Sequence, residues 1–87
     1  MTDDEKARVD EARSAADEAY DALLHAQIRE AEEQRESVRA RAWEGDVAKA
    51  RAAWKRLDAA RDATQEAQTK LQEAQLRLEC AERTRRP

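Results

Sequence analysis

The chain has 87 residues, a formal net charge of −3, 43% charged residues and 3% aromatic residues, with a single glycine and a single proline. This length excludes more than one domain, and the composition is typical of long helices and coiled coils rather than of an average globular domain. A small net charge combined with strong helix-forming residues argues against disorder. We therefore expect an all-α protein.

Residue types that carry chemistry are scarce. His25 is the only histidine and Cys80 the only cysteine, so one chain can form neither a catalytic triad, nor a multi-histidine metal site, nor an intrachain disulfide. One glycine cannot make a phosphate-binding loop. A two-helix rod also lacks the water-poor pocket that acid–base catalysis requires. We expect no enzymatic activity, no cofactor, no metal and no small-molecule substrate.

The first helix is expected over residues 3–43. Thr2 and Glu5 fit the capping-box pattern at its start, where acidic residues also favour the positive end of the helix dipole. An eleven-residue spacing from Val9 through Tyr20 predicts a nearly straight or slightly right-handed helix. The residues predicted to face a second helix are Val9, Ala16, Tyr20, Leu24, Ile28 and Val38.

The middle of the chain carries the break signal, predicted as a turn at residues 44–46. Gly45 can end a helix in the left-handed conformation, and Asp46 can cap the next helix. The alternative is one unbroken rod, because a glycine inside a helix costs only about 1 kcal/mol. Residues 1–44 carry 13 acidic and 7 basic groups, and residues 45–87 carry 7 and 10. The two halves therefore attract when they lie antiparallel.

The second helix is expected over residues 47–85. Every seventh residue is Leu57, Thr64, Leu71 and Leu78, and alanines recur three residues after them, as at the a and d positions of a coiled coil. Folding at Gly45 brings residue i roughly opposite residue 90 − i, so that within one residue Tyr20 faces Leu71 and Leu24 faces Ala67. The predicted contact residues of this helix are Leu57, Ala60, Ala67, Leu71, Ala74 and Leu78.

These elements predict one domain, residues 1–87, folded as an antiparallel two-helix coiled-coil hairpin. Its alanine-rich core is thin, so we expect hairpins to oligomerise into a helical bundle. Leu23, Leu76 and Cys80 point away from the predicted seam. They are either ordinary exposed residues or a second stripe through which hairpins associate.

A cluster at the predicted turn is the main candidate binding site. Structurally, its two tryptophans can simply close the end of the core. Trp and Arg are also the residue types most frequent at binding hot spots, which favours a protein partner. The same set can pair with phosphates and stack on bases, although the acidic overall charge argues against nucleic acid. The cluster comprises Trp43, Gly45, Trp54, Arg39, Arg41, Arg51 and Arg56.

Trp43 and Gly45 form a Trp-x-Gly motif near mid-chain, which resembles the WXG family of small helical hairpins exported by type VII secretion. The resemblance implies a dimeric hairpin, secreted without a cleaved signal, with these two residues as the motif. The tail motif of that family, a tyrosine followed four residues later by an acidic residue, is absent after the second helix. The acidic residues Glu44 and Asp46 resemble the tip of hairpins that enter the RNA polymerase channel.

We expect a non-enzymatic hairpin that mediates protein–protein interaction or structural assembly, in a bacterial or phage complex. Its partner is another protein or a second copy. The alternatives are a WXG-type secreted protein and a nucleic-acid-binding or transcription-associated hairpin acting through its tip. No apolar run reaches the roughly 18 residues of a membrane span. The acidic start lacks the features of a cleaved signal peptide, so we expect a cytoplasmic or virion-associated protein, with signal-less secretion as the alternative.

Overall fold

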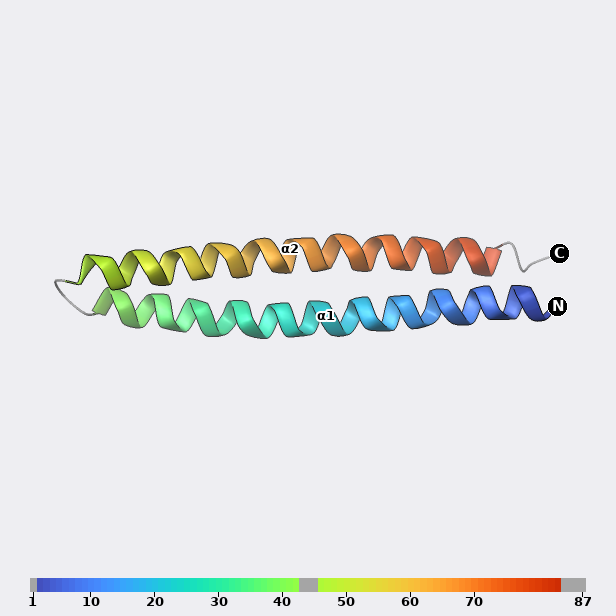
Figure 1. Ribbon diagram of the computed structural model, residues 1–87, viewed down its shortest axis with the longest axis horizontal. Coiled ribbons are helices and arrows are strands. Elements are labelled where there is room, and N and C mark those ends of the chain that lie inside the picture. The colour runs from blue at the N-terminus through green and yellow to red at the C-terminus, as the bar shows by residue number, and fades with distance from the viewer. Residues whose placement is uncertain (1, 43–45, 84–87) are drawn as a thin grey trace.

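Two long helices make up the described part of the chain. The structure is a computed structural model that describes residues 2–42 and 46–83. Helix α1 spans Asp3–Ala42 and helix α2 spans Val47–Arg83. They run antiparallel side by side in a rod of 67 × 13 × 13 Å, with the start of α1 beside the end of α2 (Figure 1). The all-α helical hairpin is confirmed, and the single-rod alternative is wrong. The predicted turn residue Gly45 lies outside the described residues.

Both helices begin at side-chain caps. The Thr2 hydroxyl oxygen accepts a hydrogen bond from the Glu5 backbone N–H at 3.3 Å, as predicted. A carboxylate oxygen of Asp46 accepts one from the Lys49 backbone N–H at 3.1 Å. Each cap satisfies a backbone donor that has no partner within its helix. These bonds fix where α1 begins and where α2 begins after the reversal of the chain.

The seam of α2 follows a heptad repeat, as the sequence predicts. Its buried and half-buried side chains alternate in steps of three and four residues, which is the spacing of a and d positions in helices that wind around each other. Alanine dominates, with leucine at only three positions. The seam of α2 comprises Ala50, Ala53, Leu57, Ala60, Thr64, Ala67, Leu71, Ala74, Leu78 and Ala81.

Helix α1 uses the same seven-residue repeat, so the eleven-residue period predicted for it is wrong. Tyr20, Ile28 and Val38 are 54%, 59% and 62% exposed, and Leu24 is also exposed. The prediction followed the largest apolar residues, whereas the seam takes the positions that stay in phase with the heptad of α2. Apart from Val9 and Leu23, those positions carry small or polar residues: Val9, Ala12, Ala16, Ala19, Leu23, Ala26, Glu30, Glu33, Ser37 and Ala40.

A hydroxyl group in the seam marks the register of the two helices. The hydroxyl oxygen of Thr64 lies 3.2 Å from the Ala26 carbonyl oxygen on α1 and 3.0 Å from the Ala60 carbonyl oxygen on its own helix. Ala26 and Thr64 are positions i and 90 − i, so the predicted register holds at this level. It sets Ala19 opposite Leu71 and Leu23 opposite Ala67, one residue away from the predicted partners Tyr20 and Leu24. Large residues thus face small ones.

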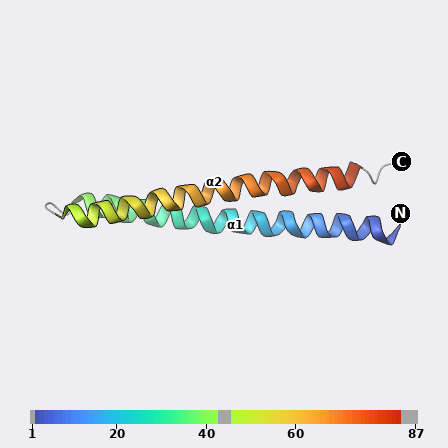
Figure 2. The ribbon, with the colours of Figure 1, turned by 45° about the horizontal axis from the view of Figure 1, so that its top comes forward.

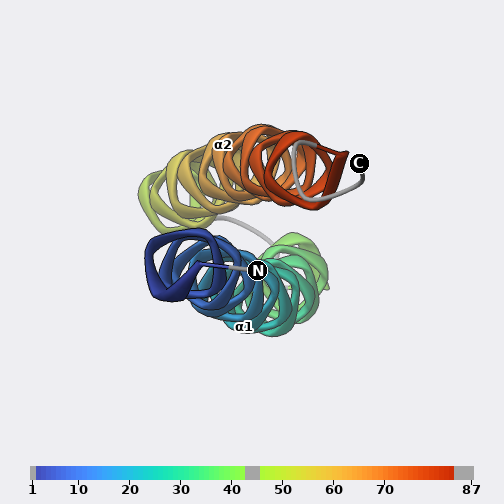
Figure 3. The same ribbon diagram turned by 90° about the vertical axis from the view of Figure 1, so that its right-hand side faces the viewer.

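The two helices wind around each other rather than lying straight. Viewed from the end that holds the start of α1, each helix turns anticlockwise as it recedes, which is a left-handed winding (Figure 3). The crossing is also visible where the ribbons overlap near the turn and separate toward the other end (Figure 2). A strict seven-residue repeat imposes this hand, because it is slightly shorter than two turns of a straight helix.

Leu57 is the largest of the buried side chains of α2, and replacing it with alanine tests the seam. Leu57 is 3% exposed, so we expect Leu57→Ala to lower the free energy of unfolding by about 2–4 kcal/mol through lost burial and an unfilled cavity. Leu76→Ala, at an exposed position of the same helix, is the matched control and should change it by about 0.5 kcal/mol or less. Urea unfolding followed by circular dichroism measures both, and equal effects would contradict this seam.

Candidate interaction surface

The seam becomes polar toward the turn. Glu33 occupies a seam position, and its side chain is only 19% exposed. One of its carboxylate oxygens lies 3.2 Å from Nε of Arg56 on α2. Ser37, one helical turn further on, is buried. The half of the hairpin near the turn therefore contains fewer large apolar contacts than the open half, which holds Val9, Leu71 and Leu78.

The hairpin has two flanks, one on each side of the seam. We assign Val9 and Ala50 to position a of their heptads. The first flank is then the surface formed by the e and b positions of both helices. Within the described residues, two contacts between e positions of the two helices lie on this flank. Arg13 on α1 is 3.8 Å from Glu82 on α2. The guanidinium carbon of Arg41 lies 4.8 Å from the ring centroid of Trp54.

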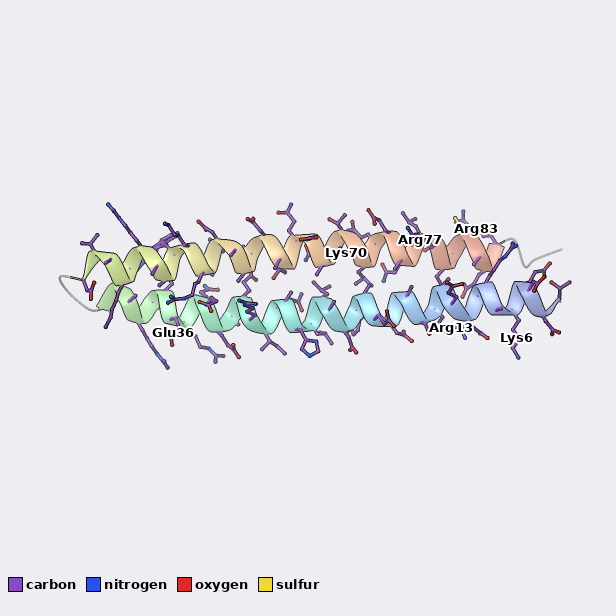
Figure 4. All side chains as sticks on the ribbon, in the orientation of Figure 1. Lys6, Arg13, Glu36, Lys70, Arg77 and Arg83 are labelled. Carbon is purple, nitrogen blue, oxygen red and sulfur yellow. The ribbon has the colours of Figure 1, made fainter. Side chains whose placement is uncertain are left out.

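The second flank comprises the g and c positions and carries an open groove between the helices. Small side chains floor the groove, because alanines occupy the g positions Ala15, Ala22 and Ala63. Charged side chains rim it, including Lys70, which pairs with Glu66 at 3.3 Å. Charged side chains project along the whole rod, Lys70 and Arg77 among those labelled on α2 (Figure 4). The second flank is therefore a charged surface with a shallow alanine floor.

The predicted basic tip does not form a single cluster within the described residues. Arg41, Arg51 and Trp54 belong to the first flank, where Trp54 is 40% exposed beneath the Arg41 guanidinium. Arg39 and Arg56 belong to the second flank and are paired with carboxylates, Arg39 with Glu36 at 3.0 Å. The other two predicted tip residues, Trp43 and Gly45, lie outside the described residues.

The predicted oligomer stripe is also divided. Leu23 is half-buried in the seam, whereas Leu76 and Cys80 are exposed on α2. The heptad sets Leu23 opposite Ala67, so this leucine serves the contact between the two helices of one hairpin. His25 is exposed, and its Nδ1 donates a hydrogen bond to the Asp21 carbonyl oxygen at 2.8 Å.

Exposed apolar side chains gather on the first flank, which sequence reasoning missed. Seven large hydrophobic residues of the described chain are exposed. Five of them occupy e or b positions, two lie at the outermost f positions, and none lies on the second flank. Assigning the heptad of α1 correctly is the signal that would have found them. The five are Tyr20, Leu24, Val38, Val47 and Trp54.

Comparison of the chain with protein-family models, with curated proteins and with solved structures gives no significant match. Within residues 2–42 and 46–83, no three His, Cys, Asp or Glu side chains are grouped to hold a metal ion. Neither helix contains, over its described length, a stretch that is long and apolar enough to cross a membrane. Function is therefore inferred from the shape and chemistry of the two flanks.

The partly buried carboxylate of Glu33 provides a test of the polar seam. Leucine has a similar volume and needs no hydration, and Arg56 stays hydrated because more than half of its side chain is exposed. We expect Glu33→Leu to raise the free energy of unfolding by about 1–2 kcal/mol. Glu32→Leu, at the exposed neighbouring position, should change it by about 0.5 kcal/mol or less. Chemical unfolding of both variants checks this, and a destabilised Glu33→Leu would contradict it.

Proposed function

We propose that this protein is a non-enzymatic assembly module, an antiparallel coiled-coil hairpin whose first flank binds a protein surface. The observation that carries the proposal is the gathering of five of the seven exposed large hydrophobic residues on that flank. Apolar side chains scattered singly over a surface are ordinary, but a gathering on one side typifies interaction sites. Tyrosine and tryptophan are among them, and both are enriched at interfaces.

The thin seam supports the same function on energetic grounds. Of the seven fully buried apolar residues in the described chain, five are alanines. An alanine methyl group contributes under about 1 kcal/mol on burial, whereas ordering each backbone residue costs roughly 1–2 kcal/mol. Two helices of this length joined by so little apolar contact gain stability when a partner covers more of their surface. Binding and folding are then linked.

The arrangement of charged groups supports binding rather than catalysis. Within residues 2–42 and 46–83, three ion pairs join side chains that are each about half exposed or more. Such pairs are solvated and weak, and they do not provide an activated group inside a water-poor site. The groove of the second flank is open and floored by alanine methyl groups, which offer no polar group to orient a substrate.

The pairing of arginines supports a protein, rather than a nucleic acid, as the partner. Arg39 and Arg56 are engaged by Glu36 and Glu33, and Arg41 stacks on Trp54. A phosphate backbone would have to displace these carboxylates, since binding depends on free cations that release counterions. We expect no complex with single-stranded or duplex DNA or RNA in a mobility-shift assay at low salt. A salt-sensitive complex abolished by Arg39→Gln and Arg56→Gln would contradict this expectation.

The assembly function is tested by crosslinking the full chain in its native host and by thermal unfolding of the purified chain. We expect the chain to form covalent adducts with a second copy or with one partner. The melting temperature of the purified chain should rise when an excess of that partner, or of the chain itself, is added. An excess of 100 times the dissociation constant adds about 2.7 kcal/mol to the stability of the folded state. Absence of any adduct, together with a melting temperature independent of concentration and of added host protein, would refute the function.

A further inference from the structure

All six glutamines of the chain lie on the first flank. The e positions carry four of them and the b positions the other two, and every one is exposed. None occurs in the seam, at an f position or on the second flank. A residue type distributed for general solubility would be found on every exposed face of a rod. The six are Gln27, Gln34, Gln65, Gln68, Gln72 and Gln75.

These glutamines belong to an uncharged stretch along the middle of the flank. Ten e and b positions, six consecutive on α1 and four consecutive on α2, carry no charge in a chain of which 43% is charged. At the corresponding g and c positions of the second flank, most residues are charged, among them Glu18, Arg29, Glu66, Lys70 and Arg77. The uncharged residues of the first flank are Tyr20, Leu24, Gln27, Ala31, Gln34, Val38, Gln65, Gln68, Gln72 and Gln75.

The core of an interface differs from ordinary surface because it contains few charged groups and many apolar and aromatic groups. The glutamine side chain suits such a core because its amide both donates and accepts hydrogen bonds. Glutamines from two facing surfaces can therefore satisfy each other. Burying them avoids the much larger cost of removing a charged group from water.

The two ends of this flank carry opposite charge. Beside the open end of the hairpin, its e and b positions hold five carboxylates and two cations: Asp3, Asp10, Asp17, Glu79, Glu82, Lys6 and Arg13. Toward the turn, the described e and b positions hold three guanidinium groups and one carboxylate: Arg41, Arg51, Arg61 and Asp58. The flank is therefore complementary to itself only after it is reversed end for end.

We propose that the first flank is the interface for a second copy of this chain, packed antiparallel about a two-fold axis that crosses the rod. This inference rests on the proposed assembly function and names the partner. The two-fold sets the acidic end of one copy against the basic end of the other, with α1 on α1 and α2 on α2 of the partner copy. A parallel pair would instead bring like charges together at both ends. The product is an antiparallel four-helix bundle with an isologous interface.

The flank is large enough for a stable dimer. The rod is 67 Å long, and two helices each about 10 Å across present a face of about 1,300 Å². Specific complexes of standard size bury about 800 Å² on each partner. The level at which both helices are uncharged, around Tyr20, Leu24, Gln65 and Gln68, then forms the core of the contact, and the charged positions on either side of it form the rim.

Matched substitutions on the two flanks test the interface. Leu24→Glu adds a carboxylate to the first flank, and His25→Glu adds the same group one residue away on the second. A two-fold interface contains each change twice, so Leu24→Glu should weaken the dimer roughly 100-fold, at tenfold for each copy. His25→Glu should change the dissociation constant about twofold or less. Gln68→Glu and its control Thr69→Glu repeat the comparison on α2.

Sedimentation equilibrium gives the mass of each variant, and circular dichroism verifies that each remains helical. The unsubstituted chain, with a monomer mass of 10.0 kDa, is expected to form a dimer that weakens as salt screens its complementary ends. Equal weakening by Leu24→Glu and His25→Glu in folded proteins would overturn the assignment of the flank. A purely monomeric unsubstituted chain would overturn the second copy as partner.

Energy transfer between two single-cysteine proteins tests the orientation. In a Cys80→Ser background, a donor at Ala7→Cys and an acceptor at Ala48→Cys label opposite ends of the rod at exposed f positions. Within one copy these levels are about 52 Å apart. Mixing donor-labelled and acceptor-labelled chains should give strong transfer, because the antiparallel pair brings the two ends together. Weak transfer in a mixture that sediments as a dimer would overturn the antiparallel arrangement.

The outcomes separate this inference from the assembly function. A monomer that nonetheless crosslinks to a different protein in its host overturns the second copy and leaves the assembly function standing. A monomer without adducts overturns both. A dimer that is lost with Leu24→Glu, kept with His25→Glu and antiparallel by energy transfer supports both.

Discussion

The close approach of two alanine-lined helix faces is the constraint on which the rest of this molecule depends. Alanine occupies most layers of the seam, and the register repeatedly sets a leucine opposite an alanine rather than opposite another leucine. Helices with small contact residues approach each other closely, and little room remains between them for bulky groups. Tyr20, Leu24, Ile28 and Val38 of α1 therefore lie outside the seam. An alanine-rich seam therefore leaves several large apolar residues of α1 on the surface of the hairpin.

This constraint also makes the hairpin uneven along its length. The open half has the branched side chains of Val9, Leu71 and Leu78 between its helices, whereas the half near the turn has Leu57 together with Glu33 and Ser37. The seam near the turn therefore combines a buried leucine with polar groups. The cap at Asp46 and the stacking of Arg41 on Trp54 also lie in that half.

The parts of the fold that follow from local chemistry were predictable from sequence. Thr2 and Asp46 predict where each helix begins, because their short polar side chains can accept hydrogen bonds from free backbone N–H groups. The seam of α2 is readable because Leu57, Leu71 and Leu78 stand at heptad spacing among polar residues. The seam of α1 is not, because alanine is equally frequent on its buried and exposed faces and its largest residues mark a different surface.

The candidate binding surface was hidden by the same ambiguity. Until Leu23 rather than Leu24 is assigned to the seam, the glutamines of α1 have no common face with those of α2. The seam positions of α1 can be assigned only from the heptad repeat of α2, because the two helices must pack in the same repeat. A tip cluster was favoured instead because tryptophan and arginine are conspicuous in sequence. Their positions within the heptad divide them between opposite sides of the rod.

The pairing of Glu33 on α1 with Arg56 on α2 has a consequence for how this chain finds a single structure. Layers built from alanine resemble one another, so sliding one helix by a heptad preserves most of the small-residue contacts. Such near-equivalent alignments are competing minima on the folding landscape. A polar group whose partner side chain is present in only one alignment, as Arg56 is for Glu33 here, raises the energy of the others. The polar residues of the seam therefore select one alignment from a repetitive set, at some expense in stability.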